Sequence, residues 1–179
     1  MFYDTIEILS MIGVSRMYKV GDRIVYPMHG AGIVEAIEEK EIFDVTQLYY
    51  LLHIVSENME ILIPVDKSEA VGIREVVSEA VIDQMLALLG EPADAMSDNW
   101  NKRYQDNMDI LKSGDLFDAA YVVKNLTLRD RAKGLSSGEK KLLTTARNFV
   151  VSEMVVVRQI SKAEALETVD RCIPVAAEN

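Results

Sequence analysis

The sequence is poor in the residues on which catalysis and metal binding most often depend. It contains 1 cysteine and 2 histidines among 179 residues, which excludes a disulfide framework and argues against a zinc site. It lacks a GxSxG motif and a P-loop, and Gly30-Ala31-Gly32 is too short for a dinucleotide-binding fingerprint. His29 in a turn and His53 in a predicted strand are expected to be structural. We therefore expect no enzymatic activity, no cofactor and no metal; an enzyme with an unrecognised site is the weakest alternative.

Long hydrophobic runs are also missing. No apolar stretch approaches the ~20 residues that a membrane-spanning helix requires. Hydrophobic residues make up 49% and charged residues 27% of the chain, as in ordinary globular proteins. We expect no membrane contact, a cytoplasmic location and a monomer.

Basic residues are scarce overall but concentrated in one segment. The formal net charge is −10. Residues 17–97 hold 5 basic and 15 acidic residues, whereas residues 98–150 hold 10 basic and 7 acidic residues. Because an acidic surface is repelled by nucleic acid, any DNA contact is expected to lie within residues 98–150.

The first 16 residues differ from the rest of the chain. They carry Asp4 and Glu7, which argues against a signal peptide. Met17 stands directly before a strongly patterned segment. We therefore interpret residues 1–16 as an N-terminal extension or the product of a misassigned start, and expect the first domain to begin at Met17.

The first half of the chain predicts short strands. Residues 23–26, 33–37, 49–54 and 61–64 are rich in β-branched, aromatic and other apolar residues. Proline and glycine in residues 27–32 indicate a turn. This pattern predicts a small, strongly bent β-barrel over residues 17–70.

The second half, residues 71–179, predicts a compact bundle of about five helices. Val77, Val81, Met85 and Leu89 fall four residues apart, and similar helical periods recur through residues 100–111, 116–126, 139–150 and 162–169. Ser136 with Glu139, and Ser161 with Glu164, have the spacing of capping boxes. The expected fold class is therefore α+β, all-β and then all-α.

Two basic groups stand at predicted helix starts. Lys102 and Arg103 follow Trp100, the only tryptophan; an apolar ring beside cations can pack against base or sugar while the cations bind phosphate. Lys140 and Lys141 follow the first capping box, where free backbone N–H groups favour anions. The alternative for Trp100 is a core or half-buried residue, because it shares a predicted helical face with residues 104, 108 and 111. The alternative for the lysine pair is a solvated surface.

Several segments together resemble the CarD family of bacterial transcription regulators. They are residues 18–30, from Tyr18-Lys19-Val20-Gly21-Asp22 to His29-Gly30; the junction of residues 65–75; Asn99-Trp100 to Tyr104; and Gly134 to Lys140. The resemblance runs from about Met17 to about Ile173, in order and at family spacing.

The resemblance implies a Tudor-like β-barrel that binds the RNA polymerase β subunit, and a helical domain that contacts promoter DNA. It implies that Trp100 is a minor-groove wedge at the upstream edge of the melted bubble. Phosphate contacts would then be made by Lys102, Arg103, Lys140 and Lys141. The polymerase-facing positions would be Lys40 and Leu62.

The sequence departs from the family pattern at two of these positions. Gln105 stands where some members have a further basic residue, and Leu62 stands where some have an arginine. We therefore expect weaker DNA binding than in some relatives, and more apolar or backbone contact with polymerase. The alternative is a protein–protein adapter whose helices do not touch DNA.

Overall fold

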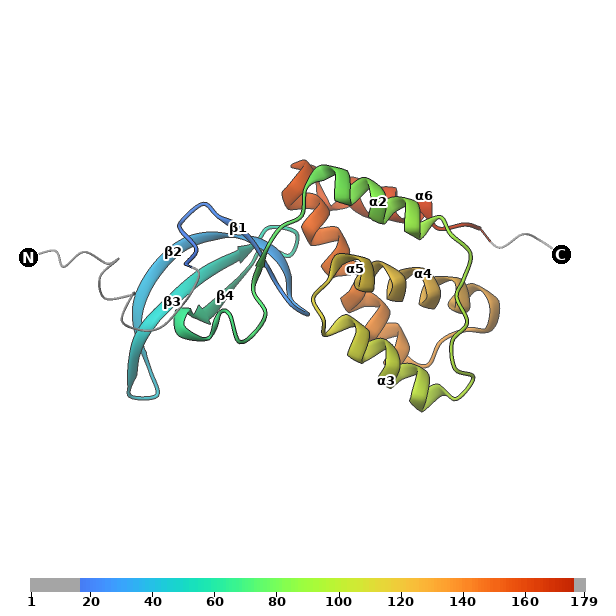
Figure 1. Ribbon diagram of the computed structural model, residues 1–179, viewed down its shortest axis with the longest axis horizontal. Helices are drawn as coiled ribbons and strands as arrows, with labels where there is room; N and C mark the ends of the chain where they lie inside the picture. Colours follow the sequence, from blue (N-terminus) through green and yellow to red (C-terminus); the bar gives the residue numbers. More distant parts are fainter. Residues whose placement is uncertain (1–16, 176–179) are drawn as a thin grey trace, which may run out of the picture.

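The computed structural model describes residues 17–175 as a β-sheet module joined to a helical bundle. Figure 1 shows the sheet on one side of the molecule and the helices on the other. The expected N-terminal extension, residues 1–16, lies outside the described residues. The α+β class is confirmed.

In the part of the chain that the structure describes, the sheet has five antiparallel strands in the order β4-β3-β2-β1-β5. The strands are β1 (Arg23–Tyr26), β2 (Gly30–Ile42), β3 (Val45–Ile54), β4 (Met59–Pro64) and β5 (Arg74–Glu75), with a 3-10 turn, η1 (Val65–Lys67), after β4. The pairings leave β4 and β5 as edges, so in the described part of the chain the expected barrel is an open, curved sheet. One face of this sheet covers a small core that includes Tyr50, Leu52 and Ile63.

The sheet reaches further along the chain than the expected boundary at residue 70. After η1 the chain returns to the sheet, where Arg74 pairs with Val25 and Glu75 with Ile24. These two bridges place residues 71–75 with the first module. The helical part begins only at α2.

Residues 17–175 form five α-helices: α2 (Glu79–Leu89), α3 (Trp100–Leu111), α4 (Leu116–Lys133), α5 (Ser137–Arg158) and α6 (Lys162–Cys172). Both predicted capping boxes are present, because Ser136 pairs reciprocally with Glu139 and Ser161 with Glu164. None of the helices within residues 17–175 has the length and apolar content needed to cross a membrane.

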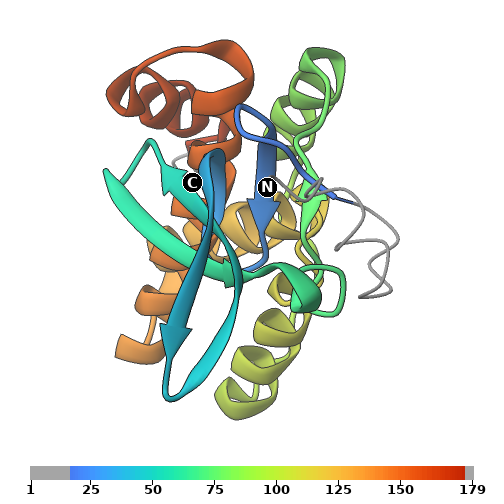
Figure 2. The same ribbon diagram turned by 90° about the vertical axis from the view of Figure 1, so that its left-hand side faces the viewer.

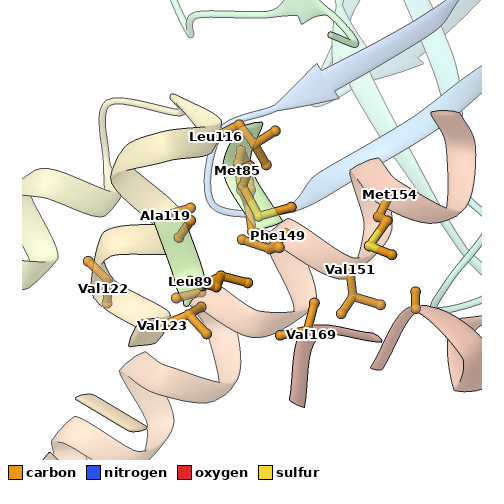
Figure 3. Close-up of a cluster of buried hydrophobic side chains, with 14 of the residues drawn as sticks. Met85, Leu89, Leu116, Ala119, Val122, Val123, Phe149, Val151, Met154 and Val169 are labelled. Carbon is orange, nitrogen blue, oxygen red and sulfur yellow. The ribbon is translucent and has the colours of Figure 1, made fainter. Parts of the chain in front are cut away.

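The helices share one apolar core. Figure 3 shows side chains from four helices converging: Met85, Leu89, Leu116, Ala119, Val122, Val123, Phe149, Val151, Met154 and Val169. Val25 and Ala31, from β1 and β2, belong to the same core. The sheet therefore packs on the bundle through buried apolar side chains, mainly against α5.

Polar contacts reinforce this packing at the middle of α5. Ala31 N donates to Ser152 Oγ at 2.8 Å, and a Cβ atom at Gly30 would lie 2.5 Å from the same oxygen. Glu153 is fully buried and accepts two hydrogen bonds from the Arg74 guanidinium, at 2.7 and 2.8 Å. It also accepts one from Val77 N at 2.9 Å. A buried carboxylate with three donors fixes the sheet relative to the helices.

Candidate nucleic-acid interface

Trp100 occupies the first position of α3 and lies at the surface. Its N-cap is Asn99, whose side chain accepts a hydrogen bond from Lys102 N. The indole is 56% exposed, whereas the buried residues of α3 are Arg103, Asn107 and Leu111. Trp100 is therefore not a core residue, and more than half of its surface is accessible to a partner.

Three of the four predicted phosphate-binding cations are also exposed. Among the described residues, the Lys102 ammonium is paired with Asp106, one turn along the same helix, at 3.2 Å. Lys140 and Lys141 lie in the second turn of α5 and are exposed. Exposed ion pairs of this kind contribute little to stability, so Lys102 can exchange its partner for a phosphate at small cost.

Arg103, the fourth predicted cation, is buried and serves the fold. It is 3% exposed; its Nε donates to Glu139 Oε1 at 2.6 Å, and one terminal nitrogen donates to the carbonyls of Ser97 and Asp98. Because its guanidinium is engaged inside the domain, Arg103 is a positioning residue here and not a phosphate contact. The prediction for this residue is corrected accordingly.

The Arg103–Glu139 pair joins the starts of α3 and α5. The second Glu139 oxygen, Oε2, accepts from the backbone N–H and the hydroxyl of Ser136, at 2.9 and 2.8 Å. One carboxylate thus completes the capping box of α5 and holds α3 beside it. Gly138 lies against the ring of Tyr104, so that a Cβ atom there would be 3.5 Å from it. The two helix starts that carry Trp100 and the lysines therefore lie side by side.

The pKa of Glu139 reflects this environment. Burial raises the pKa, but hydrogen bonds from Arg103 and Ser136 outweigh burial and hold the pKa below its ordinary value. A carboxyl group whose folded-state pKa is lowered contributes stability above its unfolded-state pKa. This contribution is lost as the pH falls through the folded-state pKa.

We therefore expect the free energy of unfolding to fall as the pH is lowered below ~4.3, the ordinary pKa of a glutamate. Urea titrations between about pH 6 and about pH 3 test this. The double variant Arg103→Met/Glu139→Gln lacks the titrating Glu139 carboxyl and its buried partner, and it is expected to show a shallower decline. If the free energy of unfolding falls equally steeply with decreasing pH in both proteins, the stabilising role assigned to the ionised Glu139 is contradicted.

Burial reduces the positive charge that residues 98–150 present to a partner. Besides Arg103, Lys124 is buried; its ammonium lies 2.8 Å from a carboxylate oxygen of Asp94. Hydrogen bonds from Lys124 and Asn125 lower the pKa of Asp94. Arg147 is paired with Asp170. The basic surface is therefore narrower than the charge count predicts, and it includes Lys102, Lys140 and Lys141.

The predicted polymerase-facing residues lie on the outer face of the sheet, away from the small core of Tyr50, Leu52 and Ile63. Leu62, on the edge strand β4, is 37% exposed and pairs with Leu51, which also pairs with Ala36. Lys40 is four residues beyond Ala36 on β2 and therefore shares its face. Its ammonium lies 3.1 Å from a carboxylate oxygen of Glu38. Within residues 17–175 the sheet thus offers a strand edge with no pairing strand, and an exposed face, to a partner.

One group among residues 17–175 has the donor set for a metal ion. Glu35, His53 and Glu60 come from three neighbouring strands, and their ligand atoms lie within 4.8 Å of one another. Glu35 is the extra residue at the bulge between Val34 and Ala36, and its carboxylate lies 3.8 Å from His53 Nδ1. Both glutamates are exposed, an arrangement common on surfaces without a metal. Sequence reasoning missed the group because the bulge brings Glu35 beside His53.

Fold and site together define a protein of two modules, in which the described residues place an exposed sheet edge and an exposed aromatic–lysine surface on one frame. Comparisons agree with this class. Residues 18–77 match the family model described as the CarD-like/TRCF RID domain, and residues 84–170 match that of the CarD C-terminal domain.

A relative in Bacillus subtilis (strain 168), named "Putative transcription factor YdeB", is 36% identical over 148 residues. The match covers 83% of this chain and 97% of that protein. The chain belongs to the CarD family of transcription factors, whose members are not enzymes.

Proposed function

We propose that this protein binds the RNA polymerase β subunit through its sheet and stabilises the promoter open complex through the starts of α3 and α5. The observation that carries the proposal is the exposed Trp100 beside Lys102, held against the start of α5 by the buried Arg103–Glu139 pair. In this proposal Trp100 packs into the minor groove at the upstream edge of the bubble.

The lysines account for the phosphate contacts. Lys102 is the third residue of α3, and Lys140 and Lys141 follow the N-terminus of α5. Free N–H groups and the helix dipole at both N-termini favour an anion. Phosphate contacts of this kind fix the position of the protein on DNA without reading the base sequence. The aromatic ring can in addition bend or unstack the DNA, which deforms easily at the junction with melted DNA.

Polymerase binding compensates for the acidity of the chain. A net charge of −10 makes binding to free DNA weak, because only a local surface is basic. Once the sheet is bound to polymerase, the helical surface is presented to the promoter at high effective concentration. The family relation of residues 18–77 to an RNA polymerase-interacting domain supports this role for the sheet. The edge strand β4 is suited to strand addition, in which a partner strand pairs with the open edge.

Charge reversal tests the DNA contact. The triple variant Lys102→Glu, Lys140→Glu, Lys141→Glu is expected to leave polymerase binding unchanged and to shorten the open-complex lifetime. It should also reduce the salt dependence of promoter binding by a slope of about 1 per lost phosphate contact.

The matched control is Lys112→Glu, directly after the other end of α3, where the lysine is similarly exposed and paired with Asp109. Among the single variants, Lys102→Glu should weaken the open complex and Lys112→Glu should not. If the triple variant and Lys102→Glu both behave as wild type, the protein acts as an adapter that does not touch DNA.

A further inference from the structure

The hairpin formed by β2 and β3 ends in a turn with an unusual residue. The strands stay in register up to the pair Ile42 and Val45, which leaves Phe43 and Asp44 as a two-residue turn. Both have positive φ angles, 52° and 60°. This is the pattern of a type I′ turn, in which Asn-Gly is strongly preferred.

Phe43 is unfavourable at this position in the free protein. A bulky residue in the left-handed region is strained because its Cβ approaches the following carbonyl oxygen. Its side chain is 95% exposed, and the neighbouring Val45 is 54% exposed. Neither the backbone conformation nor burial within the chain explains why an aromatic residue occupies position 43. Strained residues with exposed apolar side chains are characteristic of binding surfaces.

The hairpin extends the surface assigned to polymerase. Lys40 precedes Phe43 by three residues on β2, and Leu62 lies on the same outer face. Figures 1 and 2 show that the free end of the hairpin projects away from the helical bundle. A partner bound to the outer face and edge of the sheet would therefore meet the end of the hairpin as well.

The charge around the turn identifies the chemistry of the partner. Residues 38–44 contain four acidic residues and one basic residue: Glu38, Glu39, Glu41, Asp44 and Lys40. Such a segment is repelled by nucleic acid and by anionic membranes. It fits a protein surface on which an apolar pocket is bordered by basic residues.

We propose that Phe43 inserts into an apolar, basic-rimmed pocket of the RNA polymerase β subunit and is a main contact of that interface. This inference rests on the polymerase contact proposed above. An aromatic side chain that fills a pocket at an interface commonly carries a large share of the binding energy. Binding would then offset the free-energy cost of the exposed ring and the strained turn in the free protein.

Phe43→Asn tests the inference, because it separates folding from binding. Asparagine tolerates positive φ, so the melting temperature of the full-length variant should be unchanged or higher than that of wild type. Its affinity for purified RNA polymerase should fall by ~10-fold or more. Phe43→Tyr keeps the ring and should retain most of the affinity.

The matched control is Val55→Asn, which removes a 41% exposed apolar side chain just beyond the opposite end of β3. Its affinity should equal that of wild type. Wild-type affinity in Phe43→Asn, or an equal loss in both variants, would overturn the role of Phe43. If the wild-type protein itself does not bind polymerase, the proposed function fails.

Discussion

Replacing Trp100 by alanine is expected to shorten the lifetime of the promoter open complex by about tenfold relative to the wild-type protein. A tenfold change corresponds to ~1.4 kcal/mol, a modest value for an indole that leaves water to pack against an unstacked base step. The lifetime is measured by challenging preformed open complexes with a competitor and following their decay. Promoters that melt poorly should respond most.

Two controls make this result specific. Because Trp100 is 56% exposed and only begins α3, its replacement should leave the melting temperature and polymerase binding nearly unchanged. Trp100→Phe keeps an aromatic ring and should restore part of the lifetime. An unchanged lifetime in Trp100→Ala, with polymerase still bound, would exclude the wedge.

The variant Glu139→Gln is expected to lose ~3–5 kcal/mol of unfolding free energy, because it leaves the Arg103 guanidinium buried without its counter-charge. Glutamine can still complete the capping box with Ser136, so the loss reports mainly on the charge pair. Urea or thermal unfolding of the purified proteins measures it. Since the pair joins α3 to α5, promoter stabilisation should decline together with stability.

The chain offers a matched substitution in its second capping box. Glu164 also accepts hydrogen bonds from Ser161 but is exposed, so Glu164→Gln should cost much less than Glu139→Gln. Adding Arg103→Met to Glu139→Gln removes both charges and should recover most of the lost stability. Equal losses in Glu139→Gln and Glu164→Gln would show that the buried pair contributes little beyond capping.

Local sequence patterns predicted the helical elements well and the surface of α3 poorly. The capping boxes are short-range signals that depend on neighbouring residues, and they mark the starts of α5 and α6 correctly. The apolar period of α3 suggested that Trp100 shares a core-facing side with Leu111, but the structure buries Arg103 and Asn107 together with Leu111 and leaves Trp100 exposed. Burial of Arg103 depends on Glu139, 36 residues away, and no local period shows such a partner.

The prediction of the sheet was also limited by contacts between residues far apart in the sequence. Its strands were visible as β-branched and aromatic segments, but the return of Arg74 and Glu75 to the edge beside β1 depends on tertiary pairing. Arg74 also needs the buried Glu153, 79 residues further along. A signal for the hairpin turn was present, because Phe43 and Asp44 interrupt two strand-like segments. The turn lacks the glycine or asparagine by which such turns are usually recognised.

The close packing of Gly30 on Ser152 has a consequence for exchange of parts between relatives. A chimaera that joins this sheet to the helical domain of another family member brings together surfaces shaped for different neighbours. It would need a small residue facing Gly30 and a carboxylate facing Arg74 to reproduce the junction. The two halves of the molecule are therefore expected to change together in evolution at this junction, even where their outer surfaces diverge independently.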